Sequence, residues 1–520
     1  MKEKLKKIIK SVVKEDIDIQ ILIPADKKQG DYSSNIAFLL AKKRSQKPND
    51  IALEISQKIN NIKSEILQDV KVQNGFINLY LKPEFLQNEI HKILQEKENY
   101  GSNNIGKKQK LQIEFVSANP TGPLTIGNAR GGIIGDVLAN IFKKSGYNTT
   151  REYYFNDAGE QIKALGHSVL KDDEAVYKGE YIDKLHQQIK ALNVEKVGQE
   201  AAKIIIDSIQ KTALKMGIEF DIWFKEGADL REKGKVEEIV EWLRKNNLAY
   251  EKDGAVWFKS TQFGDDKDRV LIKKTGEPTY FGVDCAYHKN KFLERNFDKV
   301  INIWGADHHG DVSRLKGFVE ALGFKEKFEI ILHQFVRLIE NGKEVRMSKR
   351  KGKFILVDDL LNTVSKDVLR YFMLQYSSSS HVDFDLKLAK EKSQKNPVFY
   401  IQYAYARICG IIDKLKDKNA DLGEKEADLS LLNNPEELDL IKEMIKFPDI
   451  IREINFDYQT QKLAFYSYNL ATTFHYFYEK CRVLSDDKRI SIARLKLLLA
   501  IKIVLKNCLD LMEISGREKM

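Results

Sequence analysis

The stretch Glu114–Arg130, EFVSANPTGPLTIGNAR, has the pattern of a β-strand end, a tight turn and the start of a helix. Strand-forming residues cover Leu111–Val116, and residues that break regular structure crowd Asn119–Pro123. Apolar periodicity predicts a helix over Asn128–Phe142, with its first residue as the cap. Free backbone N–H groups and the positive end of the helix dipole would meet in the turn, so this arrangement predicts an anion site. Gly127 would let a ligand approach the backbone closely.

Length and composition limit the kind of protein. A chain of 520 residues is too long for one ordinary core, so we expect three or four domains. With 42% hydrophobic and 31% charged residues, the composition is typical of a soluble globular protein. No apolar run approaches the ~18 residues that span a bilayer, and the amphipathic N-terminus lacks the apolar core of a signal peptide. Four cysteines without a CxxC pair favour the reducing cytoplasm and argue against a structural zinc.

The net charge of the chain is +10 and its pI is about 8.9. A basic balance suits a polyanionic partner such as a nucleic acid. The lysines are spread along the whole chain, however, as they would be on any solvated surface. Charge alone therefore leaves both interpretations open.

The order of patterns along the chain predicts an α/β protein with flanking domains. Residues 1–106 are expected to form an α+β domain, and residues 385–520 an all-α helical bundle with helices over 396–413, 436–454, 461–482 and 489–512. Between them, residues 107–384 are expected to form a Rossmann-like doubly wound parallel sheet, with a mostly helical insertion at about 165–250. Its strand-like segments are Leu111–Val116, Thr149–Phe155, Val256–Phe258, Val270–Ile272, Lys299–Trp304 and Phe328–Leu332.

A cationic loop, VRMSKRKGK at residues 345–353, lies more than 200 residues beyond the first turn and carries five Lys and Arg residues. A solvated surface loop would explain its composition without any ligand. In a doubly wound sheet, however, distant loops converge at the carboxyl ends of the strands. We therefore expect Lys349 to meet the charge that develops on a triphosphate, with Mg²⁺ sharing that charge.

Acidic residues beside an aromatic one suggest a site for a cation. Tyr280 and Asp284 are four residues apart, so a helical turn would bring them to one side. Asp284 and Glu114 could then hold a substrate cation against Tyr280. The alternative is a Tyr packed in the core and an Asp that caps a helix. The pair His308–His309 has no third metal ligand at a familiar spacing, which favours recognition of a small polar ligand over zinc.

Aromatic residues crowd two segments of the predicted bundle, Tyr400–Arg407 and Phe474–Tyr478. Aromatics at helical spacing usually belong to a core. The tips of Tyr side chains are polar, however, and unstacked RNA bases pack on such rings. Both interpretations remain open from the pattern alone.

Taken together, these segments resemble the arginyl-tRNA synthetases, a family of class I aminoacyl-tRNA synthetases, over the length of the chain. The first turn resembles the HIGH signature of that class, and Met347–Arg350 resembles its KMSKS loop. Further segments that match the family are Ile23–Pro24, Gly30–Ala37, Tyr153–Gly159, Thr279–His288, Trp304–Gly310, Asn396–Ala404 and Glu518–Met520.

The resemblance implies an ATP-dependent arginine–tRNA ligase. Such an enzyme activates L-arginine to arginyl-adenylate with release of pyrophosphate, and then transfers the arginine to the terminal adenosine of tRNA(Arg). It implies ATP with Mg²⁺ as co-substrate, no tightly bound protein metal, no membrane partner and a monomer.

The resemblance also implies roles for individual residues. The expected catalytic residues are Lys349, Thr125 and Asn128. Residues expected to bind ATP are Pro123, Thr125, Gly127, Asn128, Met347, Ser348 and Lys349. Arginine is expected at Glu114, Asn119, Tyr280, Asp284 and His308, and tRNA at Tyr403, Arg407 and Met520.

One departure from the family pattern bears on activity. The signature usually reads His-x-Gly-His, whereas this chain has Thr125-Ile126-Gly127-Asn128. Thr and Asn keep hydrogen-bonding capacity, but neither can be protonated near neutral pH. A tRNA-binding paralogue with impaired or absent ligase activity is therefore one alternative, and a class I ligase for another amino acid is a second.

Overall fold

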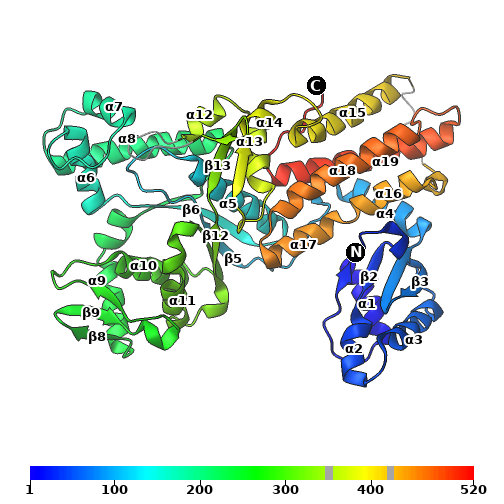
Figure 1. The fold of residues 1–520 in the computed structure, drawn as a ribbon, viewed down its shortest axis with the longest axis horizontal. Helices are drawn as coiled ribbons and strands as arrows, with labels where there is room; N and C mark the ends of the chain where they lie inside the picture. The colour runs from blue at the N-terminus through cyan, green and yellow to red at the C-terminus, as the bar shows by residue number, and fades with distance from the viewer. Residues whose placement is uncertain (346–354, 419–426) are drawn as a thin grey trace.

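The computed structural model describes residues 1–345, 355–418 and 427–520. It contains an N-terminal α+β part, a central part built on a parallel sheet, and a C-terminal helical bundle, as Figure 1 shows in blue, cyan to yellow, and yellow to red. The N-terminal part hangs from the bundle, away from the central sheet. This architecture confirms the fold class expected from the sequence. No helix in the described ranges has the length and apolar character needed to cross a membrane.

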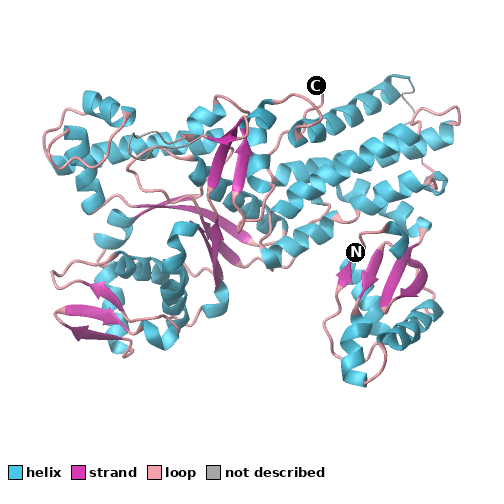
Figure 2. Cartoon of the chain, viewed as in Figure 1, coloured by secondary structure: helices cyan, strands magenta, loops and turns pink. Residues whose placement is uncertain are grey.

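The N-terminal part is a four-stranded antiparallel sheet in the order β1-β2-β4-β3, covered by helices (Figure 2). Polar contacts attach it to the bundle. Among them, the Met1 ammonium lies 2.9 Å from Asp449, Gln87 donates to the Leu432 carbonyl, and Asn507 donates to the Lys97 carbonyl. Its elements are α1 (Lys2–Val12), β1 (Ile21–Leu22), β2 (Tyr32–Ser34), α2 (Ile36–Arg44), α3 (Pro48–Asn61), β3 (Leu67–Gln73), β4 (Phe76–Leu81) and α4 (Pro83–Glu96).

The central part is organised around a five-stranded parallel sheet with the order β12-β11-β5-β6-β7. Its first half contains β5 (Lys110–Glu114), α5 (Ile126–Lys144), β6 (Asn148–Phe155), α6 (Glu160–Leu170), α7 (Glu180–Gln188), α8 (Val194–Lys215) and β7 (Ile222–Lys225). Its second half contains α9 (Lys235–Lys245), β8 (Ala249–Lys252), β9 (Ala255–Phe258), β10 (Arg269–Ile272), α10 (Tyr280–Lys289), η5 (Asn290–Glu294), β11 (Lys299–Gly305), α11 (Val312–Ala321) and β12 (Phe328–His333).

The strand order reverses between β5 and β11. From β5 the chain builds β6 and β7 on one side, and it then returns to add β11 and β12 on the other side. Ligands in open α/β sheets bind at the carboxyl ends of the strands at such a reversal. We therefore expect a ligand site at the carboxyl ends of β5 and β11.

Helix α5 packs tightly on the centre of this sheet. A Cβ atom at Gly135 would lie 2.3 Å from Phe115, so only glycine allows the helix this close to the strand end. Most residues of α5 are buried around the whole helix, as expected of an element enclosed by the sheet and the bundle.

The structure corrects several sequence expectations. Strand β5 ends at Glu114, because Val116 and Ser117 have positive φ angles of 69° and 40° that break the extended chain. Strands β9 and β10 form where expected but pair with β8 in a separate antiparallel sheet. Strand β7 lies within the segment 165–250, so the chain leaves the parallel sheet in two excursions, one before β7 and one after it.

The bundle follows a small sheet of β13 (Val336–Glu340), β14 (Lys343–Glu344) and β15 (Val382–Asp385), together with α12 (Val357–Leu361), α13 (Lys366–Leu374) and α14 (Leu386–Lys390). Its helices are α15 (Pro397–Lys418), α16 (Pro435–Met444), α17 (Phe447–Asp457), α18 (Gln461–Lys480) and α19 (Lys488–Leu511). The helix expected over 436–454 is divided into α16 and α17, with Pro448 in the first turn of the second.

A buried guanidinium joins the central part to the bundle. Arg370 of α13 has no exposed side-chain surface; its guanidinium lies 2.5 Å from Asp136 of α5. It also donates to the carbonyl of Met216 after α8 and to that of Met512 after α19. One side chain thus binds three separate elements.

We expect Arg370→Met to lower the free energy of unfolding by about 3–5 kcal/mol, because it leaves the Asp136 carboxylate and two carbonyls without this donor in a buried place. Urea unfolding followed by fluorescence would measure the change. The control is Arg337→Met, which breaks an exposed pair with Asp383 and should cost less than ~1 kcal/mol. Equal effects of the two substitutions would contradict the role given to Arg370.

Candidate active site

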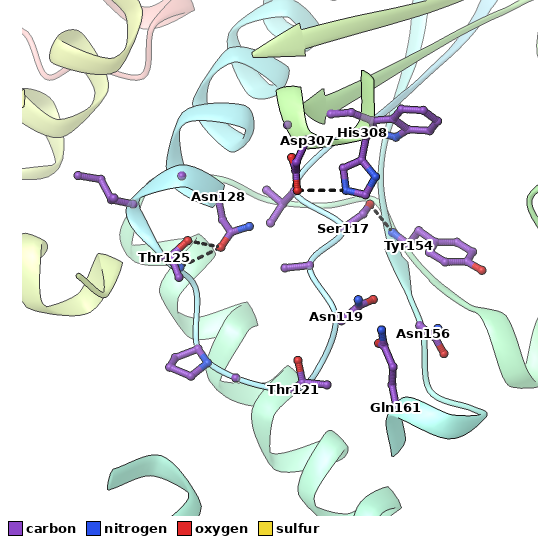
Figure 3. Close-up of a pocket in the computed structure, with 18 of the residues that line it drawn as sticks. Ser117, Asn119, Thr121, Thr125, Asn128, Tyr154, Asn156, Gln161, Asp307 and His308 are labelled. Carbon is purple, nitrogen blue, oxygen red and sulfur yellow. Dashed lines mark hydrogen bonds and ion pairs between the residues drawn. The ribbon is translucent and has the colours of Figure 1, made fainter. Parts of the chain in front are cut away.

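A cavity of about 1930 Å³ opens at the carboxyl ends of β5 and β11. Its walls come from the β5–α5 turn, the segment after β6 and the turn after β11, which Figure 3 shows, and from helix α10. All nine sequence-predicted ligand residues that the structure describes outside the bundle line it: Glu114, Asn119, Pro123, Thr125, Gly127, Asn128, Tyr280, Asp284 and His308. Residues from positions 114 to 308 therefore meet in one place.

The turn at the start of α5 forms one end of the cavity. Thr125 is the N-cap of α5, so the helix begins before the predicted position, and Asn128 takes part in the cap from within the first turn, in a capping box. The Asn128 amide oxygen instead accepts from the Thr125 N–H at 2.9 Å and from its hydroxyl at 2.8 Å, as Figure 3 shows. A Cβ atom at Gly127 would have the Thr125 hydroxyl as its nearest neighbour, 3.8 Å away, which leaves open space above the backbone.

The chain on the carboxyl side of residues 346–354 is fixed against this turn. Leu356 forms a β-bridge with Thr125, the Ile126 N–H donates to the Ile355 carbonyl, and Leu356 lines the cavity. The predicted ligands Met347, Ser348 and Lys349 lie outside the described residues.

Two carboxylates and an aromatic ring form another wall. Glu114 stands at the end of β5, and Tyr280 and Asp284 lie one turn apart at the start of α10, where the Thr279 side chain caps the helix. Tyr280 is 62% exposed within the cavity, so its ring is available to a ligand. Burial, aided by the negative charges of Glu114 and Glu226, raises the pKa of Asp284 to about 8. This pocket favours a ligand that brings a positive charge.

Sequence reasoning missed a third carboxylate in this wall. Glu226 is buried, lines the cavity, and lies 2.6 Å from Arg231 and 2.5 Å from the Tyr154 hydroxyl. It directly follows β7, a strand of four residues. The only signal for it was Ile222–Phe224, which is too short to separate from the surrounding helical pattern.

Amide side chains line the floor between the β5–α5 turn and the segment after β6. Asn119, Asn156 and Gln161 lie near one another in Figure 3. His308 lies at the opposite wall, 3.3 Å from Asp311 and 5.8 Å between ring centroids from Trp304. In the part of the chain that the structure describes, no group of three or more His, Cys, Asp or Glu side chains could hold a metal ion.

The residues predicted to contact tRNA lie in the bundle and do not line the cavity. The Arg407 guanidinium of α15 lies over the ring of Tyr403, 4.6 Å from its centroid, and over the ring of Tyr478 at 4.9 Å. The structure thus brings Tyr403 and Arg407 together in an aromatic cluster on α15 and α18. Met520, the last residue, is half exposed.

Comparisons with known proteins agree along the whole chain. Three family models match: the arginyl tRNA synthetase N-terminal domain at residues 1–81, the catalytic domain of class I (R) tRNA synthetases at 89–194 and 169–379, and the DALR anticodon-binding domain at 401–520. The chain is 41% identical to the arginine–tRNA ligase of Moorella thermoacetica over 97% of this chain and 94% of that one. It is 40% identical to that of Acetivibrio thermocellus over 100% and 99%.

A solved structure agrees with the fold. Thermus thermophilus arginyl-tRNA synthetase superimposes with a TM-score of 0.84 at 20% identity, with all of both chains covered. Together with the full-length matches in sequence, this likeness leaves one assignment: the chain belongs to the arginyl-tRNA synthetase family of class I.

Proposed function

We propose that the cavity is where this arginine–tRNA ligase joins arginine to ATP and then to tRNA, and that the residues named above carry out these steps. The observation that carries the proposal is that Glu114 and Asp284 line the same cavity as the Thr125–Asn128 turn. Arginine activation needs both an anionic pocket for the guanidinium of arginine and a turn that binds the phosphates of ATP. Full-length relatives named as ligases disfavour a paralogue that has lost this activity.

In the proposed arrangement, the substrate guanidinium lies between Glu114 and Asp284 with the ring of Tyr280 against it. A planar guanidinium presents several donors in a fixed fork, which lysine cannot reproduce with a point charge. A neutral amino acid would leave carboxylates unpaired in a partly buried place, and such a loss discriminates by orders of magnitude. Asn119 and His308 would hold the remaining polar groups of arginine.

ATP would bind at the other end of the cavity. Its phosphates would meet the N-terminus of α5 at Thr125 and Asn128, with Pro123 and Gly127 beneath the nucleotide. Magnesium would arrive as part of the ATP substrate and would lower the charge on its phosphates. The arginine carboxylate would attack the α-phosphate in line as pyrophosphate leaves, a reaction in which positioning and electrostatics supply most of the acceleration.

Met347, Ser348 and Lys349 would complete the phosphate site. The support for this role is the bridge between Leu356 and Thr125, which fixes the chain seven residues after Lys349 beside the turn. Seven residues reach at most ~25 Å, so Lys349 is within range of the phosphates.

The helical bundle would bind tRNA through Tyr403, Arg407 and Met520. Rings that carry a guanidinium on one face can stack on unpaired bases, and the exposed end at Met520 would extend that surface. We further propose domain boundaries near residues 106 and 384, a monomer, and a location in the cytoplasm, where tRNA is charged and the four buried thiols remain reduced.

We expect Asp284→Ala to raise the KM for arginine roughly a hundredfold or more, because a partly buried charged contact is lost, and to leave the KM for ATP nearly unchanged. Aminoacylation kinetics with each substrate varied in turn would measure both constants. The matched control is Asp229→Ala, whose carboxylate binds Lys233 outside the cavity. Equal increases in both constants for Asp284→Ala would remove this residue from the arginine pocket.

We expect the KM for arginine to fall as the pH rises from 6.5 to 8 and to level off above that. In the empty site the pKa of Asp284 is about 8, raised by burial, Glu114, Glu226 and Asp311 and lowered by Arg314. A guanidinium beside the carboxylate lowers this pKa, so arginine binding releases a proton below pH 8. The affinity for arginine therefore rises with pH in this range, by up to about tenfold per pH unit. A KM in Asp284→Asn that follows the same pH curve would contradict the assignment.

We expect Lys349→Ala to lower kcat about 10²–10³-fold with little loss of tRNA affinity, since its charge is needed only as phosphate charge develops. ATP–pyrophosphate exchange with arginine and tRNA would measure the first step, and filter binding the affinity. Lys351→Ala in the same loop is the control. Exchange by the unaltered protein no higher than that of Lys349→Ala would overturn the proposed function itself.

A further inference from the structure

A fully buried lysine lies directly behind the proposed arginine pocket. Lys291 of η5 has no exposed side-chain surface, and its ammonium lies 2.6 Å from the Glu114 carboxylate and 3.0 Å from the Asn302 amide oxygen. It also stands 4.1 Å above the centroid of the Tyr287 ring. Lysine is almost never buried completely unless it is paired, so these contacts account for its place in the core.

The contacts of Lys291 continue as far as the backbone of Asp284, the residue that carries the second carboxylate. Because the Asn302 oxygen accepts from Lys291, its amide N–H must be the donor to Nε2 of His288, 3.0 Å away. Nε2 is therefore the unprotonated nitrogen, and Nδ1–H donates to the backbone carbonyl of Asp284 at 2.8 Å. A continuous chain of hydrogen bonds thus joins Glu114 on β5 to Asp284 on α10 and determines the His288 tautomer.

The charges around this chain of hydrogen bonds explain why it contains a neutral histidine, His288, and one cation, Lys291. Burial, reinforced by the nearby positive charge of Lys291, holds the pKa of His288 well below its usual value. Burial also lowers the pKa of Lys291, while the adjacent Glu114 and Glu152 favour its charged form. With Asp284 and Glu226 facing the same cavity, Lys291 is the cation in direct contact with the Glu114 carboxylate.

We propose that Lys291, acting through Glu114 and through Asn302 and His288, is a positioning residue that sets the charge and geometry of the arginine pocket. This inference rests on the proposed function of Glu114 and Asp284. Lys291 does not line the cavity, so it acts on the substrate only through other side chains. Its ammonium occupies one oxygen of the Glu114 carboxylate, which leaves the other oxygen to face a guanidinium.

Removal of Lys291 has a specific electrostatic consequence. Glu114 would then be buried beside Asp284 and Glu226 without its cation, and such surroundings favour the protonated form of a carboxyl group. Arginine would have to displace that proton in order to bind. By linkage, binding should therefore release about one more proton per arginine than in the unaltered protein.

The test compares Lys291→Met with Arg295→Met in the full-length enzyme. Arg295 lies on the next turn and pairs with the fully buried Glu152. The Arg295 side chain itself is 22% exposed, and neither residue of that pair lines the cavity. Titration calorimetry of arginine in two buffers of different ionisation enthalpy counts the protons released. For Lys291→Met at pH 7.5 we expect about one extra proton and a KM for arginine raised about tenfold, with the KM for ATP unchanged. For Arg295→Met we expect neither change.

Discrimination between arginine and citrulline is the second measurement, because citrulline has the same shape with a neutral urea in place of the guanidinium. A protonated Glu114 should reduce the preference for arginine in Lys291→Met and not in Arg295→Met. Identical proton counts and identical preferences in the two variants would overturn the proposal, since they would show that Lys291 only stabilises the fold.

A double-mutant cycle keeps the proposal testable if Lys291→Met alone does not fold. Glu114→Gln removes the charge that Lys291 balances, so the double variant leaves neither member of this pair as an unpaired buried charge. Because Lys291 also acts through Asn302 and His288, adding Lys291→Met to Glu114→Gln should raise the KM for arginine by much less than the tenfold expected when Glu114 is intact. A full tenfold increase would overturn the proposal. If Asp284→Ala also leaves this KM unchanged, the failure lies with the proposed function and not with Lys291.

Discussion

The guanidinium of Arg370 is the contact on which the arrangement of the central part and the bundle depends. It binds the carboxylate of Asp136 in α5 and backbone carbonyls at the ends of α8 and α19, all without access to solvent. A buried charge is tolerated only when its partners are held in place, so these elements cannot shift independently. Because α5 also begins at the Thr125 turn, the phosphate end of the cavity is fixed relative to the bundle.

Buried charge has a different role in the proposed arginine pocket. Around Arg370 it stabilises the fold, whereas in the pocket it is left for the substrate to balance. Glu114, Asp284 and Glu226 face one cavity, and burial together with repulsion from the other two carboxylates raises the pKa of Asp284. Lys291 and Arg231 offset two of these carboxylates. Among the residues that the structure describes, none forms an ion pair with Asp284, and the positive charge of Arg314 only partly lowers its pKa. A site that is short of one positive charge is less stable when empty and is completed by a cationic substrate. A loss of stability at a functional site is a common cost of specificity.

The sequence predicted the parts of this site that local pattern controls. The Asn119–Pro123 turn, helix α5 and the Tyr280–Asp284 spacing follow from turn chemistry and helical periodicity, and each element is present. Glu226 and Lys291 could not be predicted in this way. Glu226 follows a strand of four residues, and the surroundings of Lys291 depend on pairing between β5 and β11, which lie far apart in sequence. Long-range contact, and not local propensity, makes these two residues part of the site.

The geometry of the first turn of α5 explains how Thr125 and Asn128 can stand in place of the two signature histidines. The backbone N–H and the hydroxyl of Thr125 both donate to the amide oxygen of Asn128, and these two hydrogen bonds fix the first turn of α5. Two histidines could not form this capping arrangement in the same way, since neutral imidazole has one donor and one acceptor on a rigid ring. The turn therefore keeps an oriented helix N-terminus, and the Asn128 N–H₂ group remains a donor that can face a phosphate. What the turn gives up is a protonatable group, and in-line transfer to a phosphate depends far more on orientation and fixed charge than on proton transfer.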